Sequence, residues 1–319
     1  MKKQLLLPAL LAGLCLLPAA CSAGSQGQIP PPAEPDGAPP PAADAPLSLA
    51  EDETPSYLSC RIVDGAEEGH LLLAALDGCL PDGHESVFND GRGVFRLAAE
   101  DIPVYLDGRP ASSADLRDGM PVEIAFNGQI LETFPAQVGE IYSVAAYSIG
   151  QKQNPGGGYH DLCGLYLQVL DDLWKVDSGL NEDISVAGLD LSQAPGGLLE
   201  SEKAALAWRF GELHGVEIVT GTFEELRDQG YFSPSSISTP APAEGEEPPA
   251  GWYQWEDGCL FTIGPRDGHD EEVYSLPTLF FDAEKWRSPL GAYFFADCSC
   301  VWPEAGTWSG YTVGAQCIS

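Results

Sequence analysis

Alternating apolar and polar positions characterise the chain between residues 56 and 149. Leu58, Cys60 and Ile62 alternate with Ser59 and Arg61. Short apolar runs bounded by Gly, Asp or Pro follow at 70–76, 94–97, 102–106 and 141–147. This period of two, broken at regular intervals, predicts several short strands.

A tight hairpin is predicted in the same region. Asn127-Gly128 separates the apolar runs 122–126 and 129–134, and both residues tolerate positive φ. Several short strands at this spacing fit a small closed sheet. We therefore predict that residues 56–149 form a small antiparallel OB-like β-barrel.

The hydrophobic period changes after a Gly-rich boundary at 151–158. Apolar residues between Leu162 and Trp174 recur at helical spacing, with Asp161 as the candidate N-cap. A second helix is predicted for residues 202–214, and Gly215 closes it.

A third, short helix is predicted where Thr222 and Glu225 have the spacing of a capping box. Helices first and strands afterwards are typical of an α+β domain. We predict that residues 159–319 form one, with an antiparallel sheet, about three helices and a mobile Pro/Ser/Glu loop at 233–251. Its strand-like runs are 184–191, 216–219, 259–263, 276–282, 290–299 and 307–313.

Residues 1–20 have the layout of a secretory signal peptide. Lys2 and Lys3 give a positive start, and an apolar run from Leu5 to Leu17 follows. As a helix this run covers roughly 20 Å, which is too short for the ~30 Å hydrocarbon core of a bilayer. The pattern therefore indicates export rather than a permanent membrane span.

The stretch Leu17-Pro18-Ala19-Ala20-Cys21 resembles the bacterial lipobox, with Pro18 where leucine is usual. The resemblance implies a diacylglyceryl group on the Cys21 thiol and cleavage just before that residue. It also implies an extracytoplasmic position, anchored to the outer face of the cell membrane, since two acyl chains suffice for stable anchoring. The alternative is simple secretion with cleavage nearby, for example after Ala23.

Residues 21–55 are predicted to be a disordered Pro/Ala-rich tether. Residues 22–54 contain no aromatic residue and include two triple-proline runs, so the segment has too little apolar surface to fold. Extended at ~3.1 Å per residue, it reaches up to roughly 100 Å from the membrane.

Acidic residues dominate the charge. Without residues 1–20, which contain Lys2 and Lys3 and no acid, the chain keeps 13 basic and 48 acidic residues and a net charge of −35. Phosphate backbones require clustered Lys and Arg, so nucleic acid is excluded as a partner. The charge favours cations and basic partners.

No catalytic constellation or cofactor motif stands out. The chain has no G-x-S-x-G, H-E-x-x-H, P-loop or dinucleotide glycine pattern, and its five histidines are scattered singly. The cysteines lack metal-ligand spacing, which predicts mostly buried apolar thiols. One disulfide among Cys259, Cys298, Cys300 and Cys317 is the alternative. We assign no catalytic residue, no metal ligand and no cofactor.

Two acidic loops leave calcium as a possible ligand, because oxygen ligands in a flexible loop suit this ion. Neither loop has the alternating register of an EF-hand, so a solvated acidic turn is the favoured interpretation of both. The first loop contains Asp177, Asn181, Glu182 and Asp183, and the second contains Asp267, Asp270, Glu271 and Glu272.

Five of the seven tryptophans follow residue 251. Filling the core of a small domain is the commoner use of such residues, but exposed Trp side chains also stack on sugars or anchor protein partners. Trp252 and Trp255 lie next to the Pro-rich loop and are the candidate binding surface.

Segments 115–124, 128–137, 286–293 and 306–311 resemble stretches of uncharacterised Gram-positive surface lipoproteins with a small OB-like β-barrel domain of unknown function. The resemblance implies a location and a fold but no activity. We expect a non-enzymatic surface lipoprotein that binds a glycan or a protein. The alternative is a cell-envelope or carbohydrate-active hydrolase.

Overall fold

The computed structural model describes residues 54–76, 93–131, 133–148, 161–235, 252–266, 274–275, 278–301, 308 and 310–319. The predicted signal peptide, Cys21, nearly all of the tether and the acidic loop at 267–272 lie outside the described residues, as do positions 236–251 of the predicted loop. Within the described part, no helix is both long and apolar enough to cross a membrane.

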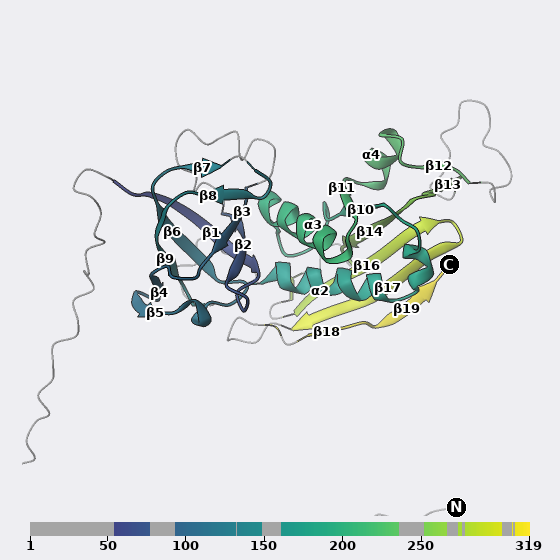
Figure 1. Ribbon diagram of the computed structural model, residues 1–319. Coiled ribbons are helices and arrows are strands. Elements are labelled where there is room, and N and C mark those ends of the chain that lie inside the picture. The colour runs from purple at the N-terminus through teal and green to yellow at the C-terminus, as the bar shows by residue number, and fades with distance from the viewer. Residues whose placement is uncertain are drawn as a thin grey trace, which may run out of the picture. The chain divides into compact units, whose positions relative to one another are not determined.

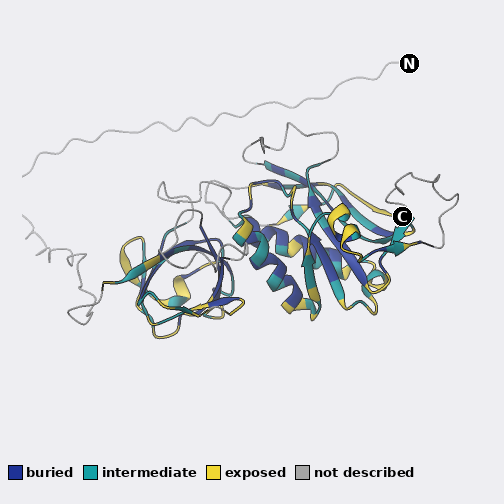
Figure 2. Ribbon diagram, turned by 90° about the horizontal axis from the view of Figure 1, so that it is seen from above, coloured by how far each residue is buried: buried dark blue, intermediate teal, exposed yellow. Residues whose placement is uncertain are grey.

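The first sheet has nine strands in the order β5-β4-β9-β6-β1-β2-β3-β8-β7 (Figure 1). The sheet curls around a core of its own (Figure 2), but its end strands β5 and β7 do not pair with each other. The strands are β1 (Ser56–Asp64), β2 (His70–Ala75), β3 (Val94–Ala98), β4 (Val104–Leu106), β5 (Arg109–Ala111), β6 (Pro121–Phe126), β7 (Ile130–Leu131), β8 (Ala136–Val138) and β9 (Ile141–Ala146).

The prediction of a closed antiparallel OB-like barrel for residues 56–149 is therefore wrong. The sheet is open, and two of its ladders, β3–β8 and β4–β9, are parallel. The alternation in the sequence showed that these segments are strands, but it does not specify which strands pair.

The predicted Asn-Gly hairpin is also wrong. Strand β6 pairs with β1 and β9, whereas β7 pairs with β8. The Asn127 side chain accepts the Gln129 N–H at 3.1 Å, and Gly128 has φ of 81°. This turn directs the chain away from β6 into the β7–β8 pair, which adds to β3.

The second sheet has eight strands, with the path β11-β10-β14-β16-β17-β18 and with β15 and β19 on β16 and β17. Its strands are β10 (Val186–Asp190), β11 (Glu217–Thr220), β14 (Gly258–Gly264), β15 (Tyr274–Ser275), β16 (Thr278–Ser288), β17 (Gly291–Val301), β18 (Tyr311–Thr312) and β19 (Ala315–Ile318). A separate pair joins β12 (Ser233–Pro234) to β13 (Tyr253–Gln254).

The described part of the chain contains three α-helices, α2 (Leu162–Lys175), α3 (Glu200–His214) and α4 (Phe223–Asp228). They lie where the periodicity and the capping signals predicted them. Asp161 accepts the Gly164 N–H at 3.0 Å, and Thr222 forms the predicted capping box with Glu225 at 2.9 and 3.2 Å. Two 3-10 turns, η1 (Ser113–Asp115) and η2 (Ser178–Asn181), complete the regular elements.

The prediction of an antiparallel second sheet is wrong, because β10 runs parallel to both β11 and β14. The β10–β11 pair is parallel because helix α3 connects these two strands. Parallel neighbours need a crossover connection of this kind, whereas antiparallel neighbours need only a short turn.

Helices α2 and α3 pack together on one face of the second sheet (Figures 1 and 2). Tyr166 and Phe210 from these helices share a core with Phe261 and Phe281 from the strands. Helix α4 covers part of the other face, where Leu226 packs in a smaller cluster with Phe232, Trp255 and Leu260.

Strand β2 is buried on both faces. Leu71 and Leu73 belong to the core of the first sheet, whereas Leu72 and Ala74 belong to the core that α2 and α3 form on the second sheet. This position explains the unbroken apolar run at 71–76, since a strand covered on both sides needs no polar face.

A buried ion pair fixes α3 against the first sheet. Arg61 Nε of β1 donates to Glu202 Oε1 at 2.7 Å, and the two side chains are only 4% and 6% exposed. The other carboxylate oxygen of Glu202 accepts the Leu199 N–H at 2.9 Å and so caps the start of α3. Ser201 Oγ donates to the Ala75 carbonyl at 2.6 Å.

The cysteines follow the prediction of buried apolar residues at five positions, namely Cys60, Cys163, Cys259, Cys298 and Cys300, while Cys317 is exposed. The alternative of a disulfide is not observed, because Cys259, Cys298, Cys300 and Cys317 are all thiols. Burial raises the pKa of the Cys259 thiol to about 12, so this thiol is un-ionised and unreactive at neutral pH.

The first prediction concerns the buried ion pair. Glu202→Gln should lower the free energy of unfolding by about 3–5 kcal/mol, because it leaves the Arg61 guanidinium buried and without its counter-charge. Glu200→Gln is the matched control, since Glu200 pairs with Lys203 on the same helix but is 77% exposed. Glu200→Gln should lower the free energy of unfolding by less than about 1 kcal/mol. Equal losses in urea denaturation would show that the buried pair does not hold α3.

The second prediction concerns the pH dependence of stability. Burial raises the pKa of the Asp161 carboxyl to about 6, against hydrogen bonds from Gly164 and Trp308 that lower it. Between about pH 4 and pH 6 the folded chain therefore binds this proton while the unfolded chain releases it, so the free energy of unfolding falls as pH rises, by roughly 2 kcal/mol.

The measurement is the difference in unfolding free energy between wild type and Asp161→Asn at pH 4 and pH 6. From pH 4 to pH 6, the free energy of unfolding of the wild type should fall by roughly 2 kcal/mol relative to that of Asp161→Asn. The reason is that asparagine cannot ionise and still caps the helix. Asp115→Asn is the control, because hydrogen bonds from Ser112 lower the pKa of this exposed carboxyl, so no change of this sign should appear. A pH-independent difference for Asp161→Asn would contradict the assignment.

Candidate functional site

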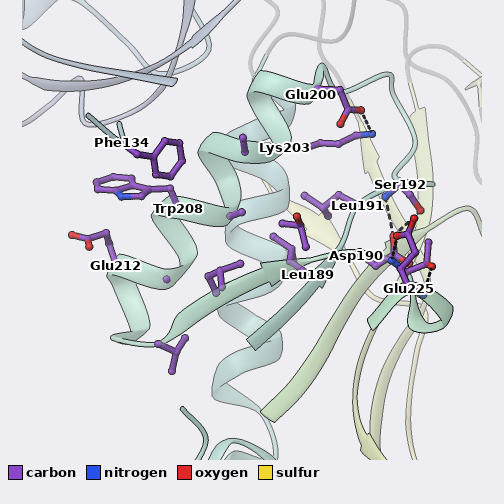
Figure 3. Close-up of a pocket in the computed structure, with 18 of the residues that line it drawn as sticks. Phe134, Leu189, Asp190, Leu191, Ser192, Glu200, Lys203, Trp208, Glu212 and Glu225 are labelled. Carbon is purple, nitrogen blue, oxygen red and sulfur yellow. Dashed lines mark hydrogen bonds and ion pairs between the residues drawn. The ribbon is translucent and has the colours of Figure 1, made fainter. Parts of the chain in front are cut away.

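A groove of about 1100 Å³ runs along the outer side of α3 (Figure 3). It is bounded by the carboxyl ends of the parallel strands β10 and β11 and by the start of α4. The carboxyl ends of parallel strands are the usual place for ligands in sheets of this kind. We call this feature the α3 groove.

The apolar part of the α3 groove has an aromatic pair at one side. Trp208 projects from α3, and Phe134 from the chain between β7 and β8 lies beside it (Figure 3). Phe134 is 44% exposed, and the Arg96 guanidinium lies over the Trp208 ring at 5.2 Å. Leu189 and Leu191 line the region between these rings and the polar side in the same view.

The polar part lies across the groove, at the ends of β10 and β11 (Figure 3). Asp190 Oδ1 accepts the Ser192 N–H at 2.9 Å and the Ser192 hydroxyl at 2.7 Å. Thr222 and Glu225 form the α4 capping box there. These hydrogen bonds hold the side chains in place. Both bonds to Asp190 use Oδ1, so Oδ2 of this carboxylate takes no part in them.

The charge of the α3 groove is negative. Its described lining has four carboxylates, from Asp190, Glu200, Glu212 and Glu225, and one ammonium, from Lys203. Lys203 Nζ is paired with Glu200 Oε1 at 2.7 Å. A ligand therefore meets three carboxylates that this lysine does not neutralise, beside an apolar wall.

The two tryptophans predicted to form a binding surface, Trp252 and Trp255, lie outside the α3 groove. Trp255 is 1% exposed and packs with Leu226, Phe232 and Leu260 under α4, so it is a core residue and is not available at the surface. Trp252 is half-buried. Neither residue lines the α3 groove.

The first acidic loop already holds a cation from the chain itself. Lys285 is fully buried, and its ammonium donates to the Val176 carbonyl, to the Asp177 carbonyl at 3.1 Å and to Asn181 Oδ1 at 3.1 Å. These oxygens lie at the end of α2, where a positive charge is stabilised by the helix dipole. The first acidic loop therefore binds the Lys285 ammonium. The second acidic loop, 267–272, lies outside the described residues.

Among the residues whose placement is described, no group of three or more His, Cys, Asp or Glu side chains is arranged to hold a metal ion. Cys21, the predicted lipidation site, also lies outside them. The lipid anchor stays a prediction.

The residues of the α3 groove were missed by the sequence reasoning. One signal was present in the pattern, since Trp208 lies off the buried stripe of α3, which includes Glu202, Leu206 and Phe210. Trp208 is half-buried and packs only at the edge of the core, so a large aromatic residue at this position is a weak signal of a surface role. The other signal, the parallel order of β10 and β11, is not readable from local sequence.

Comparison of the chain with protein-family models, with curated proteins and with solved structures finds no match.

Proposed function

We propose that this protein is a lipid-anchored extracytoplasmic binding protein and that the α3 groove is its ligand site. The observation that carries the proposal is the composition of the groove, in which a Trp208–Phe134 wall faces bonded and oriented polar groups around Asp190 and Thr222. Ligand sites combine apolar lining with a few fixed polar groups in this way.

Binding rather than hydrolysis by a serine or cysteine nucleophile is favoured by the use of these polar groups. Ser192 donates its hydroxyl to Asp190 and is not bonded to a histidine, and the described lining contains neither histidine nor cysteine. A hydrolase with a serine or cysteine nucleophile needs a base at that position. The fixed carboxylates and hydroxyls instead suit hydrogen bonds with a bound molecule.

The predicted tether and lipid anchor would determine where the protein acts. The Cys21 lipobox implies attachment to the outer membrane face, and the Pro-rich stretch implies distance from it. A binding domain on such an anchor meets molecules of the cell envelope and of the surroundings. Its acidic charge favours basic or uncharged ligands over anionic ones.

The third prediction tests the α3 groove. The full chain, in detergent micelles, is titrated by calorimetry with two uncharged or cationic probes, chitotetraose and the hexapeptide Ac-Lys-Val-Lys-Val-Lys-Val-NH₂. At least one should bind, and Trp208→Ala should weaken that binding at least tenfold, or about 1.4 kcal/mol, through loss of the aromatic wall.

Leu213→Ala is the matched control, because Leu213 is on the same helix, is 45% exposed and lies outside the groove lining. Its affinity should stay within about twofold of wild type. If neither probe binds, or if both variants bind as wild type does, the α3 groove is not the ligand site.

The fourth prediction tests the anchor. Cys21→Ser should move the protein from the membrane fraction to the soluble fraction or the medium, because each acyl methylene contributes about 0.8 kcal/mol to membrane binding and both chains are lost. Cys15→Ser, in the same N-terminal segment, should leave the protein on the membrane. Full retention of Cys21→Ser on membranes would refute the anchor.

A further inference from the structure

Strand β11 is an end strand of the second sheet. It pairs with β10 on one side, and no other described strand pairs with it. The Glu217 N–H donates to the Ser185 carbonyl at 3.1 Å and the Gly221 N–H to the Leu189 carbonyl at 3.3 Å. Because strand amides alternate in direction, the N–H and C=O groups of Ile218 and Thr220 point to the opposite, free edge.

The free edge of β11 borders the α3 groove. Ile218 and Thr220 both line it, together with Val216, Ala207 and Trp208. An extended chain added to this edge would place every second side chain on the α3 side, against these apolar groups. The edge would provide main-chain hydrogen bonds and the groove would provide contacts for alternate side chains, as in other cases of strand addition.

The charges determine the chemistry of the added chain. Asp190, Glu212 and Glu225 line the groove without a lysine or arginine partner in the described residues, and Glu217 is exposed on β11 itself. An acidic peptide would meet like charges here, whereas lysine or arginine side chains would meet opposite ones.

We propose that the ligand of the α3 groove is an extended peptide of net positive charge, which adds as a strand to the free edge of β11. This inference rests on the proposed function, which needs only that the groove binds a ligand. A glycan is less well matched, because its hydroxyl groups do not reproduce the strand-spaced amide pattern of Ile218 and Thr220.

The probe is the hexapeptide Ac-Lys-Val-Lys-Val-Lys-Val-NH₂, compared with two N-methylated forms, one carrying methyl groups on all three valine amides and the other on all three lysine amides. When the peptide pairs with β11 as a strand, only one of these two sets of amides points toward β11. A slip by one residue would turn lysines toward the apolar wall, so it is disfavoured. We expect one methylated form to bind at least tenfold more weakly and the other to bind within threefold of the parent.

Charge is tested with Ac-Glu-Val-Glu-Val-Glu-Val-NH₂, which should bind at least tenfold more weakly than the lysine peptide. On the protein side, Glu217→Gln should weaken the lysine peptide about two- to threefold, as expected for an exposed charge pair, because Glu217 is on the face of β11 opposite Ile218, toward which the lysines point. Glu68→Gln removes an equal charge at an exposed position outside the groove and should have no effect. Thr220→Pro removes an outward N–H and should weaken binding at least tenfold, with an unchanged melting temperature as evidence of folding.

The outcomes separate this inference from the proposed function. Equal binding of both methylated forms, equal binding of the glutamate peptide or absence of hexapeptide binding would overturn strand addition of a basic peptide. If chitotetraose then binds in a manner that Trp208→Ala abolishes, the proposed function stands and only the ligand class is wrong. If no probe depends on Trp208, both are wrong.

Discussion

The buried pair between Arg61 and Glu202 is the interaction on which the functional part of the structure depends. It joins residues 141 positions apart, and it uses the same carboxylate that caps α3 through the Leu199 N–H. One side chain therefore fixes both where the helix begins and where it lies against the first sheet. The outer side of that helix is the wall of the α3 groove.

Further contacts keep α3 in the same orientation. Arg209 of α3 pairs with Asp64 of β1 at 2.5 Å, and Arg96 of β3 lies over the Trp208 ring. Polar and aromatic contacts of this kind specify direction better than apolar contacts do, because they need a particular geometry. The first sheet thus acts as the support that presents the groove side of α3.

Local features of the fold were predictable from the sequence, because their causes are local. Asp161 and Thr222 cap helices within three residues of themselves, and the stripe from Leu162 to Leu173 faces one core. Pairing was not predictable in the same way. Asn127-Gly128 provides a tight turn in either arrangement, and β6 pairs with β9, which lies beyond the β7–β8 pair in the sequence, rather than with β7.

The residues of the candidate site were also only partly predictable from the sequence, for the same reason. Trp255 was placed at the surface because of its neighbours in sequence, but its indole lies directly on Gly258 of β14 and Gly188 of β10, where a Cβ atom would come within 2.1 and 2.8 Å of the ring. Two glycines on adjacent strands create the space that buries it, and this juxtaposition follows from the parallel β10–β14 register. Trp208 is half-buried, since it packs against the edge of the shared core while its ring lines the α3 groove.

The position of β1 also has a mechanical consequence. The chain enters the described fold at β1, which is not an end strand, because its first part, residues 56–61, pairs with β6 and its second part, residues 60–64, pairs with β2. A force applied to the chain before Ser56 therefore acts first on the antiparallel β1–β6 ladder, and the β1–β2 ladder holds the second part of the strand. Extension of the chain from this end must break both ladders in turn before β1 leaves the sheet.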